Sequence, residues 1–417
     1  MCFLKDKMAN KPRTLRCKGL VKHSVIGGFS TMLGGNMLLI VLLGFTIRML
    51  IALHGLHGTD ILYHLAGAFT VLKGGLLYRD VHYVYPPLYA YLQAGVIALL
   101  GRNIVAYKFW PILSDILIAI LLYLFLESNE GKNLRLIIAS IYLFNPLTLI
   151  SSSWYGLFDS LLAFLILCSL YLYIKGRKYL SSITLGVGVV TKIASLFLMP
   201  LMATHVYLRE KIRKTILWLL IFATPVFLVE FPYLVMVGKE AIKQQLKFHI
   251  ARGGEGFSLV ILFGETSANP LFPLALWFLR ILIYAIVVYL LTLNTKVGKN
   301  VIIEYSMLIL LSLITFNTFL YPHYIIYVLP LVLITYSKAL QKLLTPKIKG
   351  LNALDAEVIL PALFLIVTSI VCPMYWIFYR NYLIVSLIAV TYNTVAITFL
   401  TYSIRRELRK TIVYKRS

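Results

Sequence analysis

Long apolar runs, repeated along the whole chain, decide what this sequence can fold into. An apolar stretch of about 20 residues is long enough to cross a bilayer as a helix. Such stretches include residues 33–56, 105–126, 216–237, 271–293, 301–320, 359–378 and 383–404. Of the 417 residues, 60% are hydrophobic and only 13% are charged. Soluble domains do not contain such runs, so the sequence predicts an all-α protein that crosses the membrane many times.

The charged residues are concentrated between the apolar runs. The net charge of +24 alone would suit a nucleic-acid-binding protein. Most lysines and arginines, however, lie in alternate short loops, as the positive-inside rule expects of membrane proteins. We therefore expect membrane lipids as partners and no nucleic acid. The four cysteines are far apart and have neither metal-site nor disulfide spacing.

Placing the basic loops in the cytoplasm gives a topology of about twelve crossings. The basic termini, residues 1–33 and 405–417, are then cytoplasmic. We expect a membrane module at residues 34–340, followed by a pair of transmembrane helices at 341–404. We interpret residues 88–101 as a helix on the membrane surface, because every later loop then obeys the charge rule. A span at 88–101 stays an alternative.

Lys192 lies in a segment that is too short for two complete spans. The flanking basic loops both belong inside, yet only about 30 residues separate them, whereas two spans need about 40. We therefore predict two short helices, at residues 180–190 and 194–207, that meet at the outer side around Lys192. Protein or water has to cover the broken backbone there.

Residues 59–91 form the longest polar interruption in the first quarter of the chain. Apolar residues at 61, 62, 65, 69 and 72 predict a helix that lies along the membrane surface. Thr59 fits its N-cap, and Gly74 with Gly75 fits its end. The opposite face of this helix carries Asp60, Tyr63, His64 and Gly67. Asp60 can also be read simply as a first-turn carboxylate that the helix dipole favours.

Ionisable and polar residues gather on the predicted outer side. Charges at the edge of a span are costly and often functional, which singles out Asp159 and Lys192. Asp115 falls inside an apolar run, and we interpret it as a structural hydrogen-bond acceptor. The outer set comprises Asp60, Tyr63, His64, Arg79, Asp80, His82, Asp159, Lys192, His249, Arg252, Glu255 and His323.

The second long outer loop begins with a basic segment, residues 239–250. Its lysines at 239, 243 and 247 predict an interfacial helix that either holds an anionic headgroup or simply anchors to anionic lipids. The glycine-rich run at 253–256 does not lie between a strand and a helix, so it is not a nucleotide loop. We interpret this run as a mobile lid. The sequence contains no metal-ligand spacing, nucleophile elbow or Walker pattern.

Several segments, taken in order, resemble the GT-C class of integral-membrane glycosyltransferases. They include TDILYH, GGLLYRDVHYVYPPLYAYL, YLFNPLTLISSSWYGLFDSLLAF, LGVGVVTKIASLFLMPL, KFHIARGGEGFS and FNTFLYPHYIIYVLPL. The resemblance is strongest to the mannosyltransferase branch that includes the first GPI mannosyltransferase. It implies a GT-C-like bundle with amphipathic helices in the first outer loop. It also implies transfer of a hexose, such as mannose, from a polyprenyl-phosphate donor to a lipid-linked or glycan acceptor.

The resemblance also assigns roles to residues. An aspartate in the first outer loop acts as the base in such enzymes, and Asp60 matches it. A second acid often stands two residues further on, where this chain has Leu62, so we expect neither a metal nor another cofactor. The donor phosphate would be bound by Lys192, Arg252 and His249. The acceptor or sugar would be bound by Tyr63, His64, Arg79, Asp80, Tyr85, Asp159 and His323.

Two other classes of protein stay open. A transporter or flippase of lipid-linked sugars usually has internal repeats and polar groups near the bilayer midplane, whereas here the polar groups crowd the outer edge. A non-catalytic scaffold subunit would not need Asp60, Lys192 and Arg252 together. If the protein is an enzyme, we expect it in the cell membrane, with its active site on the extracytoplasmic side. A small accessory membrane subunit is a further partner to test.

Overall fold

A computed structural model of the chain describes residues 35–126, 131–250, 254–263, 271–293, 301–344 and 355–416. The chain divides into two compact units, Met1–Leu39 and Ile40–Ser417. Only the first residues of helix α2 (Gly35–Ala52) are described in the first unit, so the fold is that of the second. The predicted cytoplasmic segment 1–33 lies outside the described residues.

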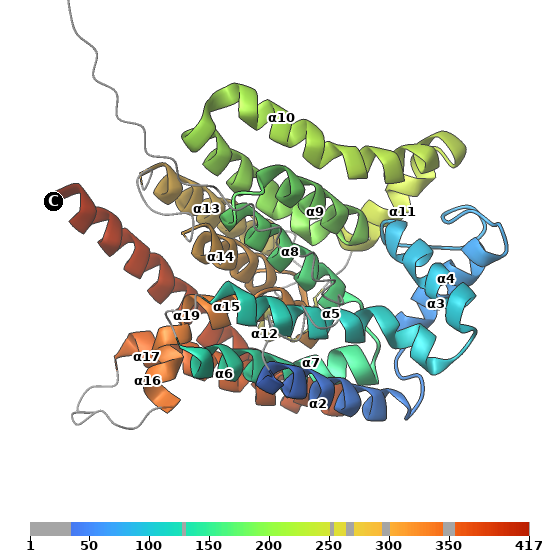
Figure 1. The fold of residues 1–417 in the computed structure, drawn as a ribbon, viewed down its shortest axis with the longest axis horizontal. Coiled ribbons are helices and arrows are strands. Elements are labelled where there is room, and N and C mark those ends of the chain that lie inside the picture. Colours follow the sequence, from blue (N-terminus) through green and yellow to red (C-terminus); the bar gives the residue numbers. More distant parts are fainter. Residues whose placement is uncertain are drawn as a thin grey trace, which may run out of the picture. The chain divides into compact units, whose positions relative to one another are not determined.

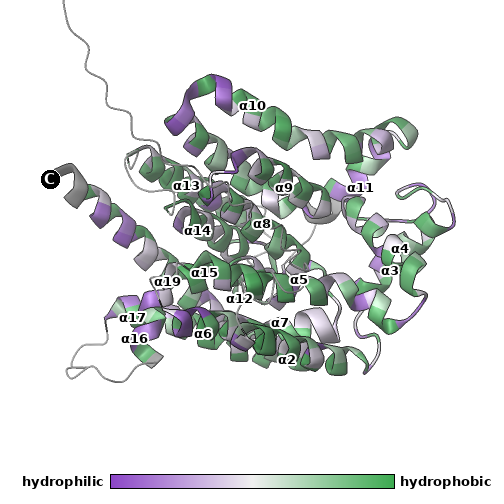
Figure 2. Cartoon of the chain, viewed as in Figure 1, coloured by the Kyte–Doolittle hydropathy of each residue, from purple (hydrophilic) through white to green (hydrophobic). Residues whose placement is uncertain are grey.

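Helices make up nearly all of the described chain, and most are apolar on every side, as expected of helices in lipid (Figure 2). Six stretches are long and apolar enough to cross a membrane, or up to eight if two bent pairs each count as one span. The six are Gly35–Ala52, Ile104–Phe125, Ile193–Met236, Leu271–Leu293, Ala356–Phe378 and Tyr382–Ile412. The predicted all-α polytopic membrane fold is confirmed, while the count of about twelve crossings stays a prediction.

The predicted break at Lys192 is present. Helix α9 (Lys178–Thr191) ends directly before Lys192, whose backbone is extended, with φ −158° and ψ 133°. A 3-10 helix, Ile193–Leu198, follows and leads into α10 (Met199–Met236). Helix α10 turns back on itself at Lys211, where φ is 65°, and it packs against α9 (Figure 1).

Two short helices follow α2, α3 (Asp60–Leu72) and α4 (Leu88–Leu100), and they pack against each other (Figure 1). The two predicted helices therefore exist with nearly the predicted bounds, while their place on the outer membrane surface stays a prediction. Thr59 stands at the N-cap position of α3 but makes no capping hydrogen bond with its side chain. That part of the prediction is wrong, because the Thr59 backbone is helical rather than extended.

The predicted faces of α3 also need correction. His64 and Gly67, which belong to the predicted polar face, are buried together with Ile61 and Leu65, whereas Leu62 is 53% exposed. The loop after α3 explains this rotation. A Cβ atom added at Gly67 would lie only 2.7 Å from the Tyr83 ring, so the loop covers this side of the helix.

A bent helix precedes Asp159. Helix α6 (Lys132–Leu143) meets α7 (Pro146–Leu149) at an angle of 47°, and Asn145 caps α7 by accepting the Leu147 N–H at 2.9 Å. Helix α7 continues as a π-helix over Ile150–Trp154. A four-residue turn then leads to α8 (Asp159–Ile174), so Asp159 begins a helix at the edge of the bundle.

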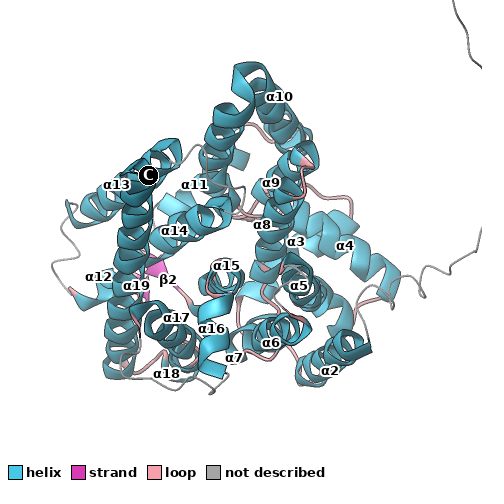
Figure 3. Ribbon diagram, turned by 60° about the vertical axis from the view of Figure 1, so that its left-hand side comes forward, coloured by secondary structure: helices cyan, strands magenta, loops and turns pink. Residues whose placement is uncertain are grey.

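The described part of the glycine-rich run forms a short strand. Strand β1 (Glu255–Gly256) pairs in parallel with β2 (Phe319–Leu320) (Figure 3). Gly256 has φ +70°, and a Cβ atom there would lie 1.8 Å from the Leu320 carbonyl oxygen. This pairing places Glu255 and Gly256 against β2, while the interpretation of the run as a mobile lid stays a prediction. Glycine serves the close approach of two backbones at this point.

The remaining helices complete the bundle. They are α5 (Ile104–Phe125), α11 (Lys239–Ile250), α12 (Leu259–Leu262), α13 (Leu271–Leu293), α14 (Val301–Thr315), α15 (Leu329–Thr335), α16 (Ser337–Leu344), α17 (Ala356–Ile366), α18 (Met374–Phe378) and α19 (Tyr382–Arg416). Helix α19 packs against α13, α14 and α17. The predicted domain boundary at 340/341 stays a prediction.

Asp115 has the structural role expected of it. Arg48 donates to its carboxylate from two guanidinium nitrogens, at 3.2 and 3.3 Å, and the Tyr142 hydroxyl donates at 2.8 Å. Arg48 also donates to the Leu143 carbonyl oxygen at 2.6 Å. All three side chains are fully buried, so this polar network joins α2, α5 and α6 inside the bundle.

Candidate functional site

A buried ion pair lies where α8 begins and α9 ends. The Lys192 ammonium donates to Asp159 at 2.7 Å, and the side chains are 6% and 2% exposed. Asp159 stands in the first turn of α8, where the helix dipole stabilises a carboxylate. The sequence placed both residues at span edges but did not predict that they pair. The broken backbone at Lys192 is thus covered by protein.

Two more side chains complete the surroundings of Asp159. The Tyr327 hydroxyl donates a hydrogen bond to the same carboxylate oxygen as Lys192. The His323 Nε2 atom lies 4.0 Å from the other oxygen. Both residues come from the 3-10 helix Pro322–Tyr327, which begins with a proline after β2. Asp159 therefore joins α8, α9 and this 3-10 helix.

Aromatic rings surround the Lys192 ammonium. The ring centroids of Tyr324, Phe158, Tyr85 and Tyr327 lie 4.7, 5.2, 5.7 and 5.7 Å from the Lys192 nitrogen. A cation close to aromatic faces is attracted by the ring quadrupoles, most strongly when it is shielded from water. Among the described residues, the Asp159 carboxylate and a cage of these four rings therefore stabilise the Lys192 ammonium.

His64 brings α3 to this cage. Its ring packs edge-on against Phe158 and Tyr89, at 4.6 and 5.3 Å, and is tilted toward Tyr85 at 5.1 Å. Within the described chain, its buried Nδ1 atom has no hydrogen-bond partner. Asp60 lies one helical turn earlier and is half-buried. Its carboxylate makes no hydrogen bond or ion pair with the part of the chain that the structure describes.

The imidazole of His64 is expected to make stability depend on pH. Burial lowers the pKa of His64 to about 4. The unfolded chain therefore binds a proton at this imidazole more readily than the folded chain does. The stability that the neutral imidazole gives the folded chain is complete above pH 6.5 and is lost as pH falls toward 4. We expect the free energy of unfolding of the wild type to fall by up to ~3 kcal/mol across this window, relative to that of His64→Gln.

Thermal unfolding between pH 8 and pH 4 measures this difference. His82 is exposed on the same loop, so His82→Gln is the matched control and should keep the wild-type slope. Equal slopes for wild type and His64→Gln would contradict the prediction.

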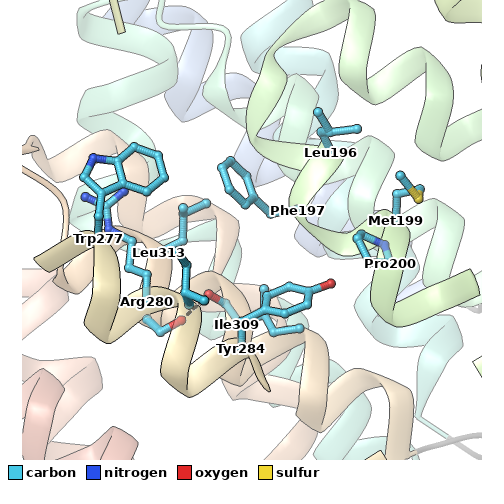
Figure 4. Close-up of a pocket in the computed structure, with 11 residues that line it drawn as sticks. Leu196, Phe197, Met199, Pro200, Trp277, Arg280, Tyr284, Ile309 and Leu313 are labelled. Carbon is cyan, nitrogen blue, oxygen red and sulfur yellow. Dashed lines mark hydrogen bonds between the residues drawn. The ribbon is translucent and has the colours of Figure 1, made fainter. Parts of the chain in front are cut away.

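An apolar groove opens beside Lys192. One cavity of about 230 Å³ is lined by Lys192, Tyr324 and Tyr327 at its polar end. A second cavity of about 350 Å³ continues from it between the start of α10 and α13 (Figure 4). The residues that line both are Phe197, Trp277, Arg280 and Leu313. The arrangement offers two cations, Lys192 in its pair with Asp159 and Arg280, beside apolar space for a hydrocarbon chain.

Arg280 is the charged residue of this groove to which sequence reasoning assigned no role. Its guanidinium stacks on Trp277 at 4.4 Å and donates to the Phe316 carbonyl oxygen at 2.8 Å and to the Asn317 side chain at 3.3 Å. No described carboxylate accompanies it. The available signal was its place as a charged residue in the apolar run 271–293, because such charges are rarely accidental.

Other predicted site residues lie apart from the Asp159–Lys192 pair. Arg79 and Asp80 form an exposed ion pair at 2.8 Å, and Asp80 also accepts the Leu76 N–H at 2.7 Å. These contacts hold the pKa of Asp80 to about 2 and close the turn after α3. Tyr63 is 52% exposed. The His249 side chain and Arg252 lie outside the described residues.

Glu255 contacts the site indirectly. The Tyr321 hydroxyl donates to its carboxylate at 2.8 Å, and the Tyr321 ring stacks on His323 at 5.7 Å. The strand pair of β1 and β2 therefore extends toward Asp159. Among the described residues, no group of three or more His, Cys, Asp and Glu side chains could hold a metal ion.

The chain is similar in sequence to one protein family and in fold to a protein of known structure. The family described as GPI transamidase subunit PIG-U matches residues 63–254. The structure is similar to ArnT from Cupriavidus metallidurans in the apo state, with a TM-score of 0.51 and 13% identity over 89% of this chain and 77% of that one. ArnT bound to undecaprenyl phosphate is similar with a TM-score of 0.50, at 13% identity over 90% and 77%.

No curated protein matches the chain in sequence. The GT-C-like bundle predicted from the resemblance is confirmed as a fold. At 13% identity the likeness to ArnT shows the fold alone.

Proposed function

We propose that the protein is an inverting glycosyltransferase that moves a hexose, with mannose as the first candidate, from a polyprenyl-phosphate donor to a lipid-linked or glycan acceptor. The observation that carries the proposal is the buried Lys192 ammonium in the wall of an apolar cavity that Arg280 also lines. A lipid phosphate has the same two parts, a charged head and a long apolar chain. The structure of ArnT with undecaprenyl phosphate supports this class of ligand.

The proposed chemistry uses the carboxylate of Asp60. It takes the proton of the acceptor hydroxyl while that oxygen bonds to the anomeric carbon of the donor sugar. The bond from this carbon to the phosphate oxygen breaks on the opposite side, so the configuration inverts and the lipid phosphate leaves. A base in this role contributes ~10²–10⁴-fold.

The leaving phosphate needs positive charge near it. Lys192 and Arg280 both line the cavity and would supply fixed donors in a site shielded from water, where they act most strongly. Arg252 and His249 stay assigned to the phosphate as well. We assign the acceptor and sugar to Tyr63, His64, Arg79, Asp80, Tyr85, Asp159 and His323. We further propose that this site faces the extracytoplasmic side and that both termini are cytoplasmic.

A non-catalytic membrane subunit is the second candidate function. The match to GPI transamidase subunit PIG-U over residues 63–254 favours it, because that family is described as a subunit of a transamidase and not as a sugar transferase. In that case the groove and the cation at Lys192 would bind the substrate for a partner chain. Asp60 would then have no role in proton transfer.

Transfer of labelled hexose from synthetic polyprenyl-phosphate sugars by the purified protein, in lipid nanodiscs with a membrane extract as acceptor, tests the two candidates. The enzyme predicts a labelled product that is absent with Asp60→Asn. Donor binding with no transfer by the wild type would contradict the enzyme and support the subunit.

Transfer activity is expected to survive EDTA. Leu62 stands where the resembled branch often has a second acid, so Asp60 would work without a metal ion. The measurement is transfer rate before and after chelation and after added Mn²⁺ or Mg²⁺. Loss of activity on chelation that Mn²⁺ restores would show that another acid of the outer loops completes a metal site.

A further inference from the structure

Lys108 is fully buried in α5, and no described carboxylate forms an ion pair with it. Its ammonium instead lies among four backbone carbonyl oxygens. The distances from its nitrogen are 2.6 Å to Gly55, 2.8 Å to Ser153, 2.9 Å to Trp154 and 3.3 Å to Ala52. A lysine ammonium has three donors and no acceptor, so a cluster of carbonyl oxygens suits it. Carbonyl groups at helix ends lack partners within their helix, and this cation supplies one.

The four oxygens belong to two different segments of chain. Ala52 and Gly55 lie at the end of α2 and in the turn that leads to α3, which begins at Asp60. Ser153 and Trp154 end the π-helix, and the turn after them leads to Asp159. One ammonium thus holds together the two segments that deliver Asp60 and Asp159.

Further contacts join the same two segments. The His57 ring stacks on Trp154 with centroids 3.9 Å apart and planes 4° apart. Gly156 has φ +66°, and a Cβ atom there would lie 3.1 Å from the Lys108 side chain and 2.6 Å from Ile61. The space around the Lys108 stem is therefore filled by both segments, and little movement is left to them.

We propose that Lys108 is a positioning residue that fixes the first outer loop relative to the turn before α8, and so sets the distance between Asp60 and the Asp159–Lys192 pair. The effect on sugar transfer rests on the proposed function. The fixing of the two segments does not, and it can be measured without any substrate. An apolar side chain at this place would remove the donor that all four carbonyl groups share.

Hydrogen–deuterium exchange of the full chain in detergent tests the proposal. In Lys108→Ala, amides of residues 53–58 and 154–158 should exchange at least ~10-fold faster, while those of α9 keep the wild-type rate, because only the local structure opens. The substitution removes three carbons and the nitrogen, so n-propylammonium replaces what is missing. This amine should restore slow exchange in both segments, and tetramethylammonium, which has no N–H donor, should not.

Lys73→Ala, at an exposed lysine after α3, is the matched control and should match the wild type. If the wild type transfers sugar, Lys108→Ala should lose ~10–100-fold in turnover, regain it with n-propylammonium and keep its donor affinity. If exchange in the two segments changes as predicted but the wild type transfers no sugar, the proposed function is overturned and the positioning role of Lys108 stands.

Three results would overturn the positioning role. They are unchanged exchange in both segments, a uniform rise along the whole chain, and a rise that n-propylammonium does not reverse. If Lys108→Ala does not fold, Lys108→Met keeps most of the stem and gives the same comparison of segments. Failure of both variants to fold would assign Lys108 to the stability of the whole bundle and would also overturn the proposal.

Discussion

Asp60→Asn is expected to lower the single-turnover rate of the proposed transfer by at least ~10²-fold while donor affinity barely changes. Asparagine keeps the size and polarity of aspartate but cannot take the acceptor proton. The Asp60 carboxylate makes no hydrogen bond or ion pair with the described chain, so the substitution leaves no partner unsatisfied there. The loss should therefore appear in the chemical step. Donor titration and single-turnover transfer of labelled sugar measure the two quantities separately.

Glu240→Gln is the matched control for Asp60→Asn. Glu240 is a partly exposed acid of α11 whose ion-pair partner is Lys243, at 3.4 Å, and it lies outside the proposed site. It should keep both donor affinity and turnover. A variant Asp60→Asn that bound donor poorly but turned over normally would assign Asp60 to binding, and a silent variant would remove it from the mechanism.

Lys192→Met is expected to destabilise the protein by ~3–5 kcal/mol, because it leaves the Asp159 carboxylate buried without its cation. Tyr327 and His323 remain, but neither carries the fixed positive charge that Lys192 does. The double variant Lys192→Met/Asp159→Asn removes both charges and should recover more than half of this loss. Equilibrium unfolding of the two single variants and the double variant in detergent gives the coupling energy.

Measuring donor affinity for the same variants distinguishes the effect of Lys192 on stability from its effect on ligand binding. The double variant should regain stability yet still bind the polyprenyl-phosphate donor weakly, because the Lys192 charge beside the groove is gone. Lys178→Met breaks the more exposed pair with Glu210 and should cost only ~0–1 kcal/mol. A silent Lys192→Met, or wild-type donor binding by the double variant, would contradict the assigned role.

The sequence predicted those features of the fold that depend on local length and charge. The bounds of α13 match the predicted span 271–293, and the break at Lys192 agrees with two basic loops that lie too close together. The pairing of Lys192 with Asp159 depends on how α8 and α9 pack, and no local pattern encodes that. The predicted face of His64 is wrong because the loop after α3 covers it, which periodicity alone does not indicate.

Gly256 shows a different limit of sequence reasoning. A glycine-rich run suggests motion, although glycine also allows two backbones to approach closely. Its pairing with Leu320 joins segments more than sixty residues apart, so only the folded chain distinguishes the two meanings. Arg280, in contrast, is visible in the sequence as a charge inside an apolar run, but its neighbours in the groove come from other helices.

The π-helix at Ile150–Trp154 gives this part of the chain room to lose a residue but none to gain one. A π-helix holds about one more residue in its turn than an α-helix, and the two turns cover nearly the same angle. Loss of one residue of this stretch would let it close as ordinary helix and would leave the direction of the following chain almost unchanged. One more helical residue would instead rotate the following chain by about 100° and turn Asp159 away from Lys192. During evolution, this stretch can therefore shorten by one residue more easily than it can lengthen.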